Sequence, residues 1–303
     1  MLLMMVTNVL FASQDSVFSF RFCSDVTVTA DYPKNFSGNK KTQLVFFALP
    51  NGNSTAQTMG KKLIADDDWH FDIQHIAAQT RFVRNEMPNE NVVVVYLEND
   101  FKAWPQWKKK HEDYLLLIPK IIYTIQQVLQ LKNCSLHLNG HSGGGSFVLG
   151  FIQSQNNIPD AVQRITFLDS DYGYDSTFTM KLVGWLKKSA SHHLSVFAYN
   201  DSVVVYNGKP LVSPTGGTWY RSKLMLKDLS AYFPFEIKRQ DSVLQYSSKN
   251  RINFFLVDNP EKKIFHTVQV ERNGFIHSML LDTKKESKHY WYWGNRAYSE
   301  WIE

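Results

Sequence analysis

Residues 135–152 read SLHLNGHSGGGSFVLGFI. A short strand-like segment, 135–138, is separated from a helix-like segment, 146–152, by the pattern G-x-S-x-G at 140–144. When this pattern joins a strand to a helix, the turn is so tight that the flanking positions tolerate no side chain. The serine hydroxyl is then exposed above the sheet. We therefore interpret Ser142 as a candidate nucleophile, and a glycine-rich turn with an incidental serine is the alternative.

The rest of the chain supports a sheet around this turn. Short apolar runs typical of buried strands occur at 43–49, 92–97, 135–138, 164–168, 194–199 and 252–257. Helical patterns lie between several of them, at 115–129, 144–155, 179–188 and 220–232. Alternating strands and helices predict the α/β class, with a mostly parallel central sheet flanked by helices.

We expect one domain over residues 15–303. Residues 17–22 and 25–30 alternate like an antiparallel pair that leads into the sheet. The segment 202–251 is long for a plain connection, and Asn207-Gly208 within it is a strong hairpin signal, so we interpret this segment as an insertion. The uncharged first 14 residues are too short to span a bilayer and favour a cleaved signal peptide, hence a secreted or periplasmic protein.

Composition excludes several other classes of protein. The 303 residues are 44% hydrophobic and 14% aromatic, which suits a large buried core and rules out a disordered or coiled-coil chain. The two cysteines, Cys23 and Cys134, are too few for a disulfide scaffold, and the sequence leaves open whether they pair. A net charge of +5 without a long basic run does not favour nucleic-acid binding. No other long apolar run predicts membrane insertion, and no Cys/His cluster predicts a metal site.

A nucleophilic serine needs an acid and a base, which in this kind of sheet follow in the order Ser, Asp, His. Asp201 follows the strand-like run 194–199 and is the favoured acid; Asp169 and Asp171, which follow the preceding run, are the rivals.

Three histidines lie after the last predicted strand: His266, His277 and His289. We favour His277 as the base because Gly274 precedes it, as in a loop that returns to the site. His266 is the runner-up, in the strand-like run 265–270.

Two fixed donors must stabilise the oxyanion formed in acyl transfer. The backbone N–H of Gly143, which follows the serine, is the first candidate. The second is sought in Pro50-Asn51-Gly52-Asn53, directly after the predicted strand 43–49, with Gly52 and Asn53 as the favoured donors. A plain Pro-Asn-Gly turn is the alternative for this segment.

With Ser142 in its turn and usable acids and bases behind it, the chain resembles the α/β-hydrolase fold family over nearly its whole length. The segment at 50–53 departs from the His-Gly oxyanion loop of many esterases. The resemblance implies a serine hydrolase without a cofactor, in which Ser142 attacks a carbonyl, His277 moves the proton and Asp201 holds the imidazolium. The expected substrate is a small-molecule or polysaccharide-linked ester, with Trp104, Trp107, Trp219 and Tyr220 as candidates to stack on a sugar or aromatic group. The alternatives are a peptidase or acyltransferase with the same triad, and a binding protein that has lost the chemistry.

Overall fold

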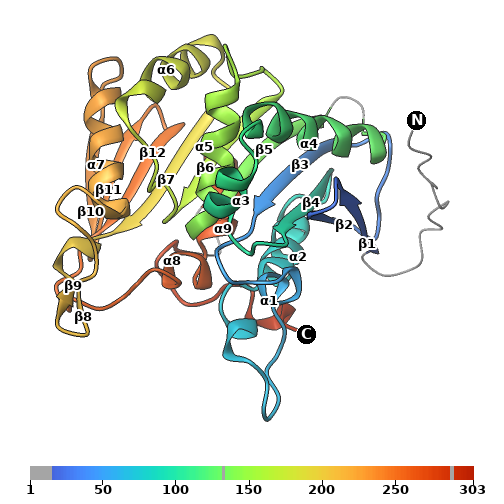
Figure 1. Ribbon diagram of the computed structural model, residues 1–303, viewed down its shortest axis with the longest axis horizontal. Coiled ribbons are helices and arrows are strands. Elements are labelled where there is room, and N and C mark those ends of the chain that lie inside the picture. Colours follow the sequence, from blue (N-terminus) through green and yellow to red (C-terminus); the bar gives the residue numbers. More distant parts are fainter. Residues whose placement is uncertain (1–15, 132–133, 287–289) are drawn as a thin grey trace.

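The computed structural model of the protein describes residues 16–131, 134–286 and 290–303. The predicted signal segment 1–14 and His289 lie outside these residues, so export stays a prediction. The main sheet has the strand order β1-β2-β4-β3-β5-β6-β7-β12-β11-β10 (Figure 1). Its strands are β1 Ser16–Phe22, β2 Val26–Tyr32, β3 Lys41–Ala48, β4 Glu90–Asn99, β5 Cys134–His141, β6 Val162–Leu168, β7 His193–Tyr199, β10 Glu236–Gln240, β11 Val243–Ser248 and β12 Ile252–Val257.

The middle of the sheet is parallel, and both edges are antiparallel. Strands β4, β3, β5, β6, β7 and β12 run parallel to one another. Antiparallel strands β1 and β2 extend one edge, and β11 and β10 extend the other. All six predicted apolar runs lie in the parallel strands, which confirms the predicted α/β class with a mostly parallel central sheet.

Helices cover both faces of the sheet. They are α1 Thr55–Met59, α2 Ile76–Glu86, α3 Trp104–Lys110, α4 Tyr114–Val128, α5 Gly145–Ser154, α6 Thr179–Lys188, α7 Gly217–Ser230, α8 Val268–Glu271 and α9 Gly274–Leu280. Short 3-10 turns are η1 Trp69–Asp72, η2 Ser142–Gly144, η3 Ser176–Phe178, η4 Asp201–Val203 and η5 Ser299–Trp301. The four predicted helices correspond to α4, α5, α6 and α7. Helix α4 begins before Pro119 and continues through it.

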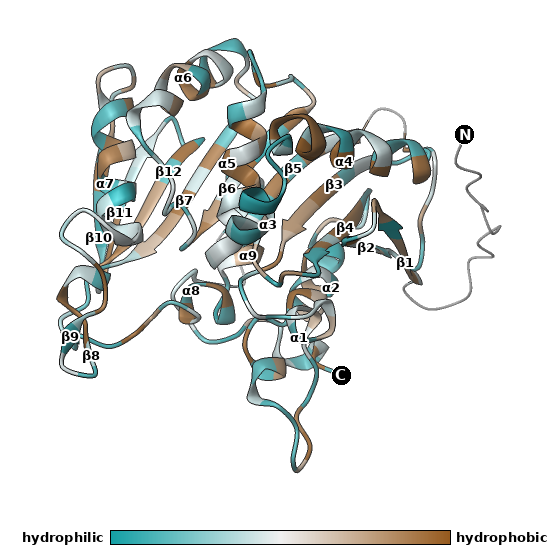
Figure 2. Cartoon of the chain, in the orientation of Figure 1, coloured by the Kyte–Doolittle hydropathy of each residue, from teal (hydrophilic) through white to brown (hydrophobic). Residues whose placement is uncertain are grey.

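The core is divided by the sheet into two layers, because successive side chains of a strand point to opposite faces. In β3, Leu44 and Phe46 pack with helices α3 to α7, whereas Val45 and Phe47 pack with α2, α9 and the C-terminal segment. Figure 2 shows the resulting hydrophobic colouring of the middle strands, in contrast to the hydrophilic helix α3. Burial on both faces explains why these strands read as continuous apolar runs.

The predictions for the remaining segments had mixed outcomes. The antiparallel pair β1 and β2 is confirmed, as is the hairpin at Asn207-Gly208, where β8 Val205–Tyr206 pairs with β9 Lys209–Pro210. Strands β10 and β11, inside the segment 202–251, were not predicted, because every residue of β10 is exposed and its sequence carries no apolar pattern. The strand-like run at 265–270, the alternative setting for His266, does not form a strand, since this segment forms a turn and helix α8.

Candidate active site

Ser142 directly follows β5 and begins the turn into α5. Its φ is +53°, in the left-handed region that L-residues avoid unless the surrounding structure imposes it. The glycines after it allow close contacts. A Cβ atom on Gly144 would lie 2.0 Å from the carbonyl oxygen of Ala48, and one on Gly145 would lie 1.7 Å from that of Ser170. Glycine is therefore required where the turn passes between neighbouring strand ends.

A cavity of about 640 Å³ opens at Ser142. Its wall comes from four parts of the chain: the segment after β3, helix α3, the turn with α5, and the segment after β6. The lining residues include Asn51, Lys108, Ser142, Gly143, Tyr172 and Phe178. Because the carboxyl ends of parallel strands meet at one edge of a sheet, this is the place where such folds gather ligand-binding loops.

His266 and Asp169 form a close pair at the same edge of the sheet. Nδ1 of His266 lies 2.5 Å from Oδ2 of Asp169, which directly follows β6 and is fully buried. The hydroxyl of Thr218 donates a hydrogen bond to the other carboxylate oxygen, Oδ1. Since a carboxylate accepts, the proton of the neutral imidazole is on Nδ1, and Nε2 is left as the basic nitrogen.

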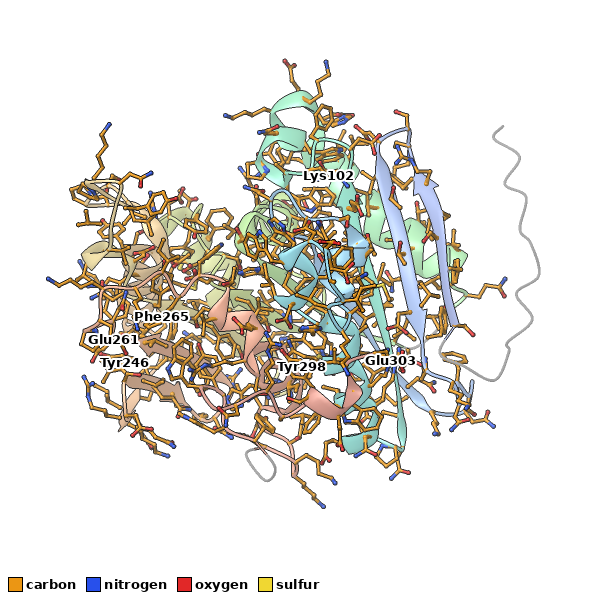
Figure 3. The ribbon with its side chains drawn as sticks, turned by 90° about the horizontal axis from the view of Figure 1, so that it is seen from below. Lys102, Tyr246, Glu261, Phe265, Tyr298 and Glu303 are labelled. Carbon is orange, nitrogen blue, oxygen red and sulfur yellow. The ribbon has the colours of Figure 1, made fainter. Side chains whose placement is uncertain are left out.

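The loop that carries His266 is attached to the residue before Ser142. Nε2 of His141 donates to the carbonyl oxygen of His266 over 3.1 Å, and the two rings are 4.7 Å apart. Burial, and then the nearby His266, lower the pKa of His141 well below its usual value, so that His141 stays neutral. Phe265 fixes the other side of the loop by packing against Tyr199 and Trp293. Figure 3 labels Phe265 among the side chains of the molecule.

His277, the predicted base, lies elsewhere. It is in helix α9 and is fully buried, with Nδ1 3.1 Å from the hydroxyl of Tyr290 and its ring 4.8 Å from that of Phe255. Burial lowers its pKa to about 3, so the imidazole is neutral. Gly274, interpreted as a loop glycine, instead begins this helix, where a Cβ would lie 2.1 Å from the carbonyl oxygen of Gln269. Among the described residues, no hydrogen bond or ion pair joins His277 to Asp201.

Asp201, the predicted acid, faces helix α7. Its Oδ2 accepts from the backbone N–H of Thr218 over 2.9 Å, so the carboxylate caps the start of α7. Burial, and then the neighbouring Asp169, raise its pKa to about 6. Asp171, the alternative acid, accepts from the hydroxyl of Ser222 over 2.9 Å, and burial raises its pKa well above the usual range. Among these three carboxylates, Asp169 is the one paired with a histidine.

Two of the predicted oxyanion donors are not placed for that role. The N–H of Gly52 donates to the carbonyl of Lys102 over 2.8 Å, and Asn53 is buried outside the cavity lining. Asn51 lies at the site instead. A Cβ on Gly143 would come 1.8 Å from Oδ1 of Asn51, and both residues line the cavity beside Ser142. In the segment 50–53, the residue that reaches the site is therefore Asn51, and not the favoured donors Gly52 and Asn53.

No family model and no curated protein matches this sequence. Solved structures do match it. A mutant of the feruloyl esterase module from Clostridium thermocellum, complexed with sinapinate, superposes with a TM-score of 0.54 at 12% identity over 94% of each chain. A protein described as FAE gives 0.53 at 11% identity over 92% of each chain. A thermostable esterase gives 0.49 at 15% identity, over 82% of this chain and 56% of its own.

The chain has the α/β-hydrolase fold. The identities are too low to transfer an activity, so the likeness defines the architecture alone. Within the α/β-hydrolase fold of this chain, Ser142 follows β5, Asp169 follows β6, and His266 comes after β12, all at the carboxyl edge of the parallel strands.

The tryptophans proposed to stack on substrate have another place in this fold. Trp104 and Trp107 are buried, and their ring centres lie 5.3 Å apart. The ring centre of Trp104 also lies 4.7 Å from that of Phe147. Neither these two nor Trp219 and Tyr220 are among the residues that line the cavity at Ser142. Its aromatic wall is formed by Tyr172 and Phe178.

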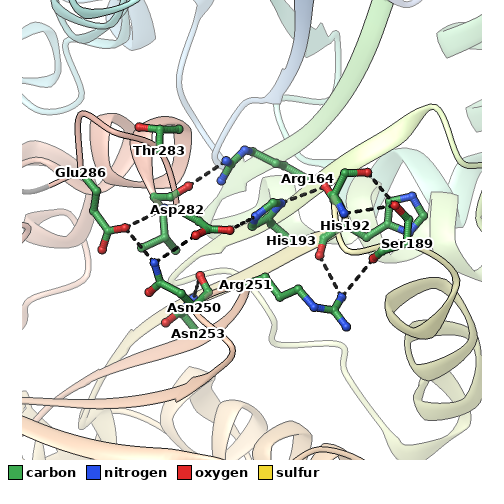
Figure 4. A network of polar contacts seen from close by, with 12 residues as sticks. Arg164, Ser189, His192, His193, Asn250, Arg251, Asn253, Asp282, Thr283 and Glu286 are labelled. Atoms are coloured by element: carbon green, nitrogen blue, oxygen red, sulfur yellow. Dashed lines mark hydrogen bonds and ion pairs between the residues drawn. The ribbon is translucent and has the colours of Figure 1, made fainter.

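A second polar cluster lies at the opposite, amino-terminal edge of the strands (Figure 4). His193 is the first residue of β7, and its Nε2 lies 2.9 Å from Oδ2 of Asp282. The side-chain amide of Asn250 donates to Oδ1 of Asp282. Arg164 donates to the backbone carbonyls of Ser278 and Leu281. These contacts tie the segment after α9 to the sheet, far from the carboxyl edge where Ser142 lies.

The described residues bear on the expectations about a membrane span, a metal site and a disulfide. Among the residues that the structure describes, no helix is both long and apolar enough to cross a bilayer. In the same part of the chain there is no group of three or more potential metal ligands. Cys23 and Cys134, whose pairing the sequence left open, are free thiols.

Proposed function

We propose that this protein is a serine hydrolase that cleaves carboxylic esters, with Ser142 as nucleophile, His266 as general base and Asp169 as the acid that orients His266. The observation that carries the proposal is the pairing of Nδ1 of His266 with buried Asp169 at the sheet edge where Ser142 begins its strained turn. This assignment replaces His277 and Asp201 as the expected base and acid.

The proposed reaction has two halves. The hydroxyl oxygen of Ser142 attacks the ester carbonyl while its proton passes to Nε2 of His266, and Asp169 stabilises the imidazolium through Nδ1. The tetrahedral intermediate expels the alcohol, which takes the proton from His266, and an acyl-enzyme remains. Water then attacks the acyl-enzyme with His266 as base, releasing the acid and restoring Ser142.

The proposed oxyanion donors are the backbone N–H of Gly143 and a donor of Asn51. Both residues line the cavity with Ser142, and the Asn51 side chain lies directly against Gly143. Donors that are fixed before the reaction stabilise the developing negative charge without reorganisation. Tyr172 and Phe178 in the same wall support an apolar or aromatic group as part of the ester.

Labelling with a fluorophosphonate probe tests the nucleophile. We expect the parent protein to be labelled and Ser142→Ala not to be. Ser146→Ala is the matched control, because Ser146 lines the same cavity. Labelling that persists in Ser142→Ala would overturn the nucleophile, and an unlabelled parent would favour the binding-protein alternative. Ester, peptide and acyl-acceptor substrates then separate an esterase from a peptidase or acyltransferase.

A further inference from the structure

Lys108 is a cationic side chain in the wall of the cavity that contains Ser142. It belongs to α3, the hydrophilic helix in front of α5 in Figure 2. Its stem packs beside Gly150 of α5, with Cδ 3.7 Å and Nζ 3.8 Å from the position that a Cβ on Gly150 would take. The ammonium group lies 4.7 Å from the ring centre of Tyr114. Lys108 is thus held along α5, half-buried, whereas Lys109 and Lys110 are exposed.

The Lys108 ammonium has no carboxylate partner among the residues that the structure describes. Its one hydrogen bond there is a long contact of 3.5 Å to the carbonyl oxygen of Ser146. Lys61, by comparison, pairs with Asp67. Burial lowers the pKa of Lys108, as expected for a cation that has lost part of its water. A partly desolvated cation without a counter-ion favours an anion brought by a ligand.

Asp175 is the acidic residue in the same cavity wall. Its side chain is exposed and accepts from the backbone N–H of Thr177 over 2.8 Å, as the cap of η3. Water screens such an exposed carboxylate, so it does not cancel the attraction of a half-buried ammonium for an anion.

We propose that Lys108 is a specificity-determining residue that binds a carboxylate of the substrate, so that the preferred esters are anionic. This inference rests on the proposed function. Ser146, whose carbonyl Lys108 contacts, follows Ser142 by about one helical turn, or roughly 6 Å along the axis. The substrate carboxylate is therefore expected a few bonds from the scissile carbonyl, within reach of a charge-assisted hydrogen bond from Nζ.

Two matched pairs of esters test the proposal and identify which side of the ester carries the carboxylate. The acyl-side pair is the 4-nitrophenyl monoester of glutaric acid and neutral 4-nitrophenyl pentanoate. The alcohol-side pair is 4-acetoxybenzoate and its methyl ester. Rates measured with Ser142→Ala provide the background for each ester. We expect the parent to have a higher kcat/KM for the anionic member of at least one pair.

The variants then identify the residue responsible. Lys108→Met should lower kcat/KM for that anionic ester about tenfold, mainly through KM, and change the neutral ester less than about twofold. Lys108→Arg should restore part of the preference, and Lys110→Met, on the exposed end of the same helix, should leave it unchanged. Equal losses for both esters, or no preference in either pair, would overturn the role of Lys108. Absence of hydrolysis of every ester would instead count against the proposed function itself.

Discussion

Nδ1 of His266 lies 2.5 Å from Oδ2 of Asp169, a carboxylate with no exposed surface. Thr218 links this pair to helix α7, because its hydroxyl donates to Asp169 while its backbone N–H donates to Asp201. Two buried carboxylates therefore share one threonine, and only Asp169 contacts an imidazole. The arrangement gives them different expected roles, with Asp169 acting on His266 and Asp201 supporting the helix that holds Asp169.

The first prediction separates these two carboxylates. Asp169→Asn should lower kcat for 4-nitrophenyl acetate by about 10³ to 10⁴, because an amide no longer fixes the tautomer of His266 or stabilises its charged form. Asp201→Asn should lower kcat less than about tenfold, because its amide oxygen still accepts from Thr218. Steady-state kinetics of the two variants provide the measurement. A larger loss in Asp201→Asn would return the acid role to Asp201.

The second prediction separates the two histidines. His277→Ala should lower the free energy of unfolding by about 3 kcal/mol, because it removes a ring from a closed core, while kcat of the folded protein stays nearly unchanged. His266→Ala should lower kcat about 10³-fold or more with little effect on stability. Urea unfolding and kinetics at low temperature measure the two effects. An inactive His277→Ala variant with a native circular dichroism spectrum would contradict the assignment.

The third prediction concerns the tight turn at Ser142. Gly145→Ala should destabilise the protein by about 3 kcal/mol, because the new methyl group would overlap the carbonyl oxygen of Ser170. Gly184→Ala is the matched control, since that glycine lies in helix α6 with nothing within 4 Å of an added Cβ. The control should stabilise the protein by about 0.5 to 1 kcal/mol through helix propensity. Similar free energies of unfolding for the two variants would show that the turn tolerates a side chain.

The fourth prediction follows from the raised pKa of Asp201. Its carboxyl titrates near 3.8 in an unperturbed chain and at about 6 in the folded protein, so between these pH values the folded state holds a proton that the unfolded state has lost. The stability from this group is complete below pH 3.8 and is lost as the pH rises through about 6. The free energy of unfolding of the parent minus that of Asp201→Asn isolates the contribution of this carboxyl group.

That difference should fall as the pH rises across this interval and should be flat above it. Asp66→Asn, which changes an exposed turn carboxyl, is the control and should show no such fall. A difference that rises with pH would mean that the carboxylate form of Asp201 is the stabilised one.

Local rules were sufficient for the frame of the molecule. The apolar runs of the parallel strands follow from burial on both faces, and the hairpin at Asn207-Gly208 follows from turn chemistry. Strands β10 and β11 escaped prediction because the edge strand β10 is exposed throughout and β11 beside it is only half-buried between its two ends, which leaves little hydrophobic pattern. The role proposed for Lys108 likewise has no local signal, since a lysine beside two other lysines is typical of a solvated helix end.

The sequence by itself determined the strand, turn and helix around Ser142, because the tight turn requires glycines at fixed offsets from the serine. Only the tertiary structure decided which carboxylate and which histidine pair at the sheet edge where Ser142 lies. Asp169 and Asp201 follow neighbouring parallel strands and reach the same edge of the sheet, so chain order does not choose between them. The choice between His266 and His277 depends on which segment after β12 crosses that edge. The hydrogen bond from His141 holds the loop of His266 at that edge. His277 is instead buried in α9, which packs on the face of the sheet that α2 and the C-terminal segment also cover.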